Sequence, residues 1–82
     1  MNKLTLSDFL FTLNQDEDTL VRIQDYDSDT IIFPRTWKSG LLRNDMYDQY
    51  KNWLVIDFQV GSASYYNPCL IINISKEDPD ND

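Results

Sequence analysis

The sequence contains no histidine and only one cysteine, Cys69, and these two absences exclude several kinds of functional site. Without histidine there is no Ser-His or Cys-His pair for nucleophilic catalysis, and the usual zinc ligand sets are missing. A single cysteine cannot form an internal disulfide, which is typical of a protein in a reducing cytoplasm. Cys69 lies in an apolar stretch, where thiols are usually inert. We therefore expect no enzyme, no metal site and no cofactor.

Long hydrophobic runs and basic residues are also scarce. Asp8 and Thr12 interrupt the apolar residues near the N-terminus, so this segment lacks a signal-peptide core. No run approaches the ~20 residues that a membrane-spanning helix needs. Seven Lys and Arg residues against 14 Asp and Glu residues give a net charge of −7. This charge repels nucleic acid and anionic membranes and attracts basic protein surfaces. We expect a cytoplasmic protein that binds neither nucleic acid nor membrane.

The first 14 residues carry the clearest signature of secondary structure. Thr5 is placed to cap a helix over residues 4–14, with Asp8 in its first turn. Apolar residues then follow at helical spacing: Leu6, Phe9, Leu10 and Leu13.

Two pairs of strands are expected after this helix. Residues 19–24 and 30–33 are rich in β-branched residues, and the first of these segments alternates between its two faces. We expect them to form a first hairpin, and we expect Pro34 to end its second strand because proline cannot donate a hydrogen bond to the ladder. Residues 53–60 and 69–74 form a second hairpin, with a short helix over about residues 45–52 between the two. In the strand at 53–60, one face is expected to hold Leu54, Ile56, Phe58 and Val60.

These elements predict one small α+β domain over residues 1–75. Its N-terminal helix packs on a four-stranded antiparallel sheet made of the two hairpins, and the short helical insert lies between them. Residues 76–82 contain four acids, one base and no apolar residue, so we expect a disordered acidic tail.

The segment QDYDSDT at residues 24–30 places three aspartates at alternate positions. This spacing matches the start of a calcium-binding EF-hand loop, but Thr30 stands where the loop needs glycine and Thr36 where it needs glutamate. Aspartate and serine also favour chain reversal, so a hairpin turn explains the segment without any ligand. A third interpretation is functional: in an extended segment, alternate carboxylates lie about 6.6–7 Å apart and imitate a short phosphate path.

Charge is concentrated around the first strand. Residues 16–29 contain six acids and one base, a local net charge of −5, whereas residues 35–43 carry +3. An adjacent Tyr65-Tyr66 pair is the other notable feature, because exposed tyrosines often anchor interfaces. Packing at a sheet edge explains the same pair equally well. The candidate partner-binding residues are Asp16, Glu17, Asp18, Asp25, Tyr26, Asp27, Asp29, Tyr65 and Tyr66.

The chain resembles small acidic accessory proteins of phages and prophages in Gram-positive bacteria. The resemblance is carried by T-L-S-D-F-L at residues 5–10 and V-R-I-Q-D-Y-D at 21–27, and it covers residues 4–74. In size and charge the chain is also similar to anti-CRISPR proteins and other phage-borne inhibitors, which commonly occupy the nucleic-acid site of a defence enzyme.

Two functions are consistent with these features. The first is a non-enzymatic phage-type inhibitor whose acidic residues bind a basic cleft of a host nuclease, for example a CRISPR nuclease. The alternative is a structural or assembly module of a phage, which acts through a sheet edge or through the Tyr65-Tyr66 loop.

Overall fold

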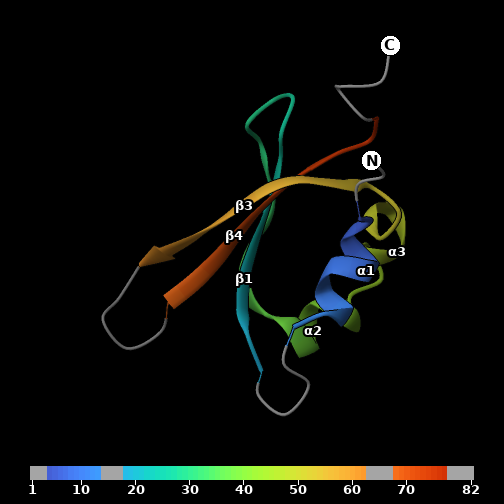
Figure 1. Ribbon diagram of the computed structural model, residues 1–82. Helices are drawn as coiled ribbons and strands as arrows, with labels where there is room; N and C mark the ends of the chain where they lie inside the picture. The colour runs from blue at the N-terminus through green and yellow to red at the C-terminus, as the bar shows by residue number, and fades with distance from the viewer. Residues whose placement is uncertain (1–3, 14–17, 63–67, 78–82) are drawn as a thin grey trace.

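The structure is a computed structural model that describes residues 4–13, 18–62 and 68–77. Its elements in chain order are α1 (Leu6–Phe11), β1 (Leu20–Asp25), β2 (Ile31–Trp37), α2 (Lys38–Leu42), α3 (Tyr47–Tyr50), β3 (Leu54–Ser62) and β4 (Pro68–Ser75). The fold is α+β, with a four-stranded mixed sheet and three short helices. Figure 1 shows the helices gathered on the same side of the sheet.

Helix α1 begins as the sequence predicts. The Thr5 hydroxyl accepts a hydrogen bond from the Asp8 N–H at 3.2 Å, which satisfies one of the free donors of the first turn. Leu6, Phe9 and Leu10 turn toward the sheet and are buried. The helix ends at Phe11, before Leu13, the last residue of the apolar pattern in the sequence.

The expectation of a purely antiparallel sheet is wrong for one of its strand pairs. Both hairpins form, β1 with β2 and β3 with β4, and both are antiparallel. The strand order is β2-β1-β4-β3, so the hairpins join through β1 and β4, which run parallel. A parallel pair needs a long crossover connection, and here β2, the helical insert and β3 lie between the two strands in the chain.

The segment after Pro34 also differs from the expectation. Pro34 does not end the second strand, because β2 continues to Trp37. Proline is tolerated there because β2 is an edge strand and its register with β1 is irregular between Ile23 and Val21. The insert holds two helices, α2 and α3, instead of one helix over residues 45–52.

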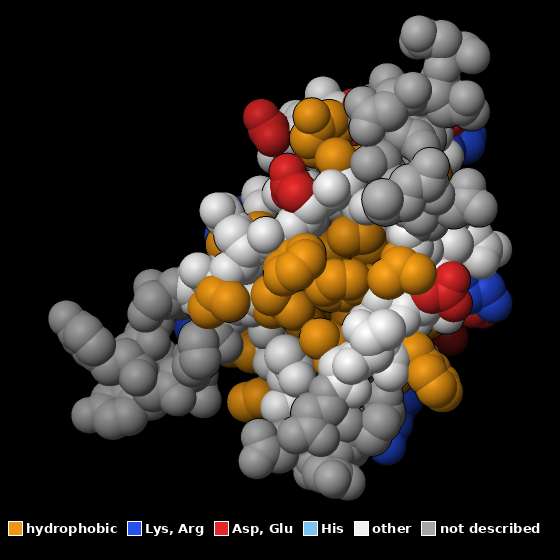
Figure 2. All heavy atoms as spheres, in the orientation of Figure 1, with side chains coloured by type: hydrophobic (Ala, Val, Ile, Leu, Met, Phe, Trp, Pro, Cys, Tyr) orange, Lys and Arg blue, Asp and Glu red, His pale blue; other side chains and the backbone are white. Residues whose placement is uncertain are grey.

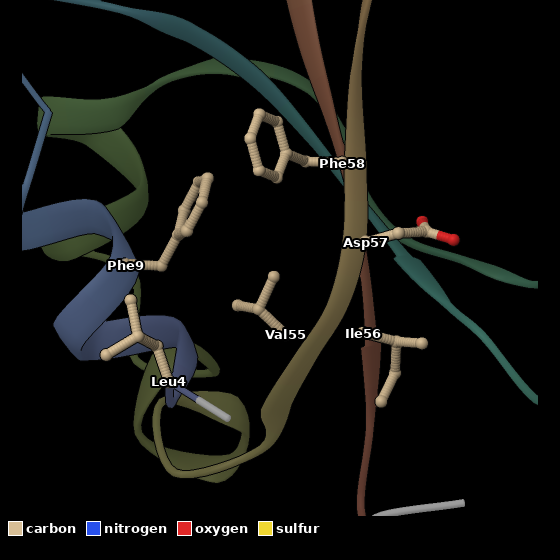
Figure 3. Close-up of a pocket in the computed structure, with 6 residues that line it drawn as sticks. All are labelled: Leu4, Phe9, Val55, Ile56, Asp57 and Phe58. Atoms are coloured by element: carbon tan, nitrogen blue, oxygen red, sulfur yellow. The ribbon is translucent and has the colours of Figure 1, made fainter. Parts of the chain in front are cut away.

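The strict alternation expected in β3 is broken near its start. The register with β4 shifts between Val55 and Asp57, which leaves Ile56 as an extra residue. Val55 and Phe58 therefore point toward α1, whereas Ile56 and Asp57 point to the opposite side of the sheet (Figure 3). Ile56 does not share a face with Phe58, contrary to the sequence-based expectation.

The core lies between the sheet and the three helices. Val21 and Ile23 of β1 and Ile72 and Ile74 of β4 are fully buried at its centre. These strands are the two inner strands of the sheet, so their apolar side chains are shielded on both flanks. The remaining members of the core cluster are Leu6, Phe9, Leu10, Phe33, Leu41, Tyr47 and Val55.

Candidate functional site: an acidic end of the sheet

The segment QDYDSDT forms the turn of the first hairpin, so its aspartates do not make a straight extended row. The Asp25 carboxylate accepts the Asp27 N–H at 3.0 Å, and the Asp25 carbonyl accepts the Asp29 N–H at 2.8 Å. Asp29 has a φ of 58°, in the left-handed region that aspartate tolerates better than most residues. The interpretation of this segment as a hairpin turn is therefore confirmed. The interpretation that required an extended segment, with carboxylates at strand spacing that imitate a phosphate path, is wrong.

The turn is tied to the end of β4. The Ser75 hydroxyl lies 2.8 Å from Asp27 Oδ2 and 2.6 Å from the carbonyl oxygen of Glu77, and it shares its proton between them. The Glu77 N–H in turn donates to the Ser75 hydroxyl at 3.3 Å. Ser75 is only 1% exposed, so this contact fixes the start of the acidic tail beside the turn.

We call this region the acidic end, and it comprises Asp25, Asp27, Asp29 and Glu77. Asp25 is half-buried and the other three are exposed. Acidic side chains are visible in red at the end of the molecule where the β1–β2 turn lies (Figure 2). Tyr26 lies within the turn with 43% of its surface exposed, and its N–H donates to Ile74 at 2.7 Å.

No arginine or lysine among the described residues forms an ion pair with the carboxylates of the turn. An ion pair that the structure does contain, Lys51 with Asp48 at 3.3 Å, lies elsewhere. Arg22 and Arg35 lie close enough to Cys69, near the start of β4, for their charges to oppose the rise of its pKa, and this position is away from the acidic end. The described part of the chain therefore leaves Asp25, Asp27 and Asp29 without an ion-pair partner.

Asp18 lies at the other end of β1 and has a structural role. Its carboxylate accepts the Ser39 N–H at 3.1 Å and the Ser39 hydroxyl at 2.5 Å, which caps the first turn of α2. It also accepts the Thr19 N–H at 3.0 Å. Because β1 is six residues long, roughly 20 Å separates Asp18 from the acidic end. The structure therefore does not bring Asp18 together with the acidic end.

Asp18 gives the first prediction, a contribution to acid sensitivity. The hydrogen bond from the Ser39 hydroxyl is the largest reason that the pKa of Asp18 lies below its ordinary value of 3.8. A carboxylate with a lowered pKa stabilises the fold above the ordinary value, and this stability is lost as the pH falls through the folded-state pKa. We expect urea midpoints measured between about pH 5 and about pH 2 to fall less steeply for Asp18→Asn than for the unaltered chain.

The control for this experiment is Asp48→Asn, because Asp48 lies on an exposed helical surface away from α2. Equal slopes for the Asp18→Asn variant and the unaltered chain would show that the capping carboxylate does not contribute to acid sensitivity.

Four of the candidate residues, Asp16, Glu17, Tyr65 and Tyr66, lie outside the described residues, as do residues 78–82 of the tail. Their roles as partner contacts stay predictions. Glu77 was not among the candidates, because it was assigned to the tail. Because β4 pairs with β1, the end of β4 lies beside the β1–β2 turn, and Glu77 follows shortly after it. The sequence alone does not show this pairing.

Comparison with known proteins adds no further constraint. No protein-family model, no curated protein and no solved structure matches the chain. The site must therefore be interpreted from its own geometry.

The other chemical groups of the chain offer little for catalysis or ligation. Burial raises the pKa of the Cys69 thiol, so little reactive thiolate forms at neutral pH. Within the described residues, no group of three acidic, histidine or cysteine side chains is arranged to hold a metal ion. None of the helices in the described ranges is long and apolar enough to cross a lipid bilayer.

Proposed function

We propose that the chain is a non-enzymatic phage-type inhibitor that acts in the host cytoplasm. In this proposal its acidic end binds a basic nucleic-acid-binding cleft of a defence nuclease, and a CRISPR nuclease is the leading candidate. The observation that carries the proposal is the position of Asp27, Asp29 and Glu77, which gather exposed carboxylates on one end of the sheet.

The hydrogen bonds of the turn do not remove this charge. The Ser75 hydroxyl donates to the Asp27 carboxylate, so it holds this side chain in place without contributing a positive charge. The turn therefore presents the carboxylates of Asp25 and Asp27 in a fixed geometry. Fixed charges lose less conformational entropy on binding than charges on mobile side chains.

The chemistry of the target supports the same proposal. CRISPR nucleases hold the guide–target duplex in a positively charged channel. An acidic surface is attracted to such a channel over a long range, which increases the association rate. Once bound, it occupies the place of the nucleic acid, so inhibition is competitive. Tyr26, partly exposed in the turn, supplies the aromatic contact that interfaces often use as an anchor.

The second prediction concerns salt. Purified nucleases with basic channels, including CRISPR nucleases, are tested for binding to the full chain at about 0.1 M and about 1 M salt, where the Debye length falls from about 10 Å to about 3 Å. We expect the affinity for the true target to fall at least roughly tenfold because exposed charges are then screened. An affinity that does not change with salt would contradict charge mimicry.

The alternative function, an assembly module, makes a different prediction. If the Tyr65-Tyr66 segment binds the partner, neutralising the turn aspartates leaves binding intact, whereas Tyr65→Ala and Tyr66→Ala weaken it. The two functions are therefore distinguished by the same binding assay.

A further inference from the structure

Strand β3 is an edge of the sheet, and the part of the chain that the structure describes leaves much of that edge open. One side of β3 pairs with β4 along its length. On the other side, the Val55 N–H donates to the Leu4 carbonyl at 2.8 Å, and Thr5 forms a bridge with Leu54. Among the described residues, no strand pairs with this side of residues 57–62.

The opposite edge of the sheet is protected, whereas the β3 edge is not. Strand β2 contains Pro34 and two register shifts, and such features discourage the addition of another strand. Residues 57–62, Asp-Phe-Gln-Val-Gly-Ser, contain no proline, lysine or arginine. An open edge with apolar side chains is a template for pairing with another chain.

The ladder shows which backbone groups face outward. The Ile74 carbonyl accepts a hydrogen bond from the Tyr26 N–H, just after β1, so the backbone groups of Ile74 point toward β1. The N–H and C=O groups of successive residues point to opposite sides of a strand. Ile72 and Leu70 therefore also direct their backbone groups toward β1. Their partners in β3 are Phe58 and Val60. In an antiparallel ladder these two residues form the non-hydrogen-bonded pairs, so their N–H and C=O groups face the open edge.

The side chains of the same two residues form an apolar surface. Phe58 is 57% exposed and Val60 is 71% exposed, on the side of the sheet that faces α1. The Phe58 ring lies 5.0 Å from that of Phe9, and both border a cleft of about 440 Å³ with Leu4 and Val55 (Figure 3). Figure 2 shows hydrophobic side chains gathered in this space between β3 and α1.

Charge indicates what kind of chain this edge accepts. Asp57 is exposed and points away from the cleft, to the other face of the sheet, where it accepts a hydrogen bond from Asn73 at 2.6 Å. A second copy of this chain would bring two molecules of net charge −7 together. A basic segment gains attraction both from Asp57 and from the chain as a whole.

We propose that β3 accepts an extended segment of a basic partner protein as an added strand. Main-chain hydrogen bonds form with Phe58 and Val60, as in other cases of strand addition. The segment has apolar residues at alternate positions, which lie beside Phe58 and Val60 and over the cleft. Its intervening residues are lysine or arginine, one of which lies opposite Asp57.

The third prediction tests this proposal with a synthetic peptide in which lysine alternates with valine and phenylalanine. We expect the full chain to bind this peptide at least roughly tenfold more tightly than a scrambled peptide of the same composition, because only the alternating peptide matches a strand. Equal affinity for the two peptides would overturn the proposal, since both carry the same charge.

Two variants locate the binding to the edge. Val60→Pro removes an N–H that faces away from β4, so the sheet is retained while a carbonyl of the peptide loses its main-chain donor. Val60→Lys keeps the N–H and places a positive charge against the peptide. We expect both variants to lower the affinity to that of the scrambled peptide, and Ile31→Lys on the β2 edge to leave it unchanged. Circular dichroism checks the folding of each variant.

Peptide binding that survives both Val60 variants would overturn the proposal. A concentration-dependent dimer of the chain alone that Val60→Pro dissociates would show that a second copy occupies the edge, and would equally overturn the choice of a basic partner.

Discussion

Replacing Ile72 by alanine is expected to lower the free energy of unfolding by about 2–5 kcal/mol, the range typical of large-to-small changes in a core. Ile72 is fully buried and lies on an inner strand, with Ile23 of β1 on one side and Phe58 of β3 on the other. β4 is hydrogen-bonded to a strand on both flanks, so its backbone cannot move to close the cavity. Small domains have a stability of only about 5–15 kcal/mol, so the variant is expected to be close to unfolding.

Urea denaturation followed by fluorescence measures this effect, because Trp53 is partly buried against the core. The matched control is Ile31→Ala, since Ile31 is 44% exposed on the edge strand β2 and should cost less than about 1 kcal/mol. If the two variants lost the same amount of stability, β4 would not be at the centre of the core.

Replacing Asp25, Asp27 and Asp29 together by asparagine is expected to weaken binding to the target nuclease by roughly tenfold to a hundredfold. Asparagine keeps the side-chain oxygens that accept from the Asp27 N–H and from Ser75, and it tolerates the left-handed conformation at position 29. The change therefore removes the charges of the turn and leaves its geometry, so a loss of affinity reports on charge.

The chain offers a control of equal charge in the residues that precede β1 in the sequence. Asp16→Asn, Glu17→Gln and Asp18→Asn also remove three negative charges, but Asp18 lies roughly 20 Å from the acidic end. We expect this variant to lose less than about threefold in affinity. Equal losses in the two variants would mean that net charge, and not the acidic end, determines binding.

The parts of the fold that follow local rules could be predicted from the sequence. The cap of α1 depends on Thr5 and Asp8, which are three residues apart, and the two hairpins depend on alternation within short segments. The parallel pairing of β1 with β4 could not be predicted, because it joins residues such as Ile23 and Ile72 that no local pattern links.

In the candidate site, too, the local turn could be predicted from the sequence, whereas the long-range contacts could not. The turn at residues 25–29 was evident from its aspartates and serine. The role of Asp18 as a cap depends on Ser39, 21 positions away, and the link from Asp27 to Ser75 spans 48 positions. These contacts arise only when the strands assemble, and they explain why Asp18 has a structural role while the turn gains Glu77 as a neighbour.

Hydrogen exchange of the chain, measured with and without its bound nuclease, tests the central role of the acidic end most directly. Binding at this end predicts slower exchange in the segment from Tyr26 to Thr30 and at Glu77, with little change around Ser39, where Asp18 caps α2. Unchanged exchange at residues 26–30, in a complex that slows exchange elsewhere in the chain, would contradict the account.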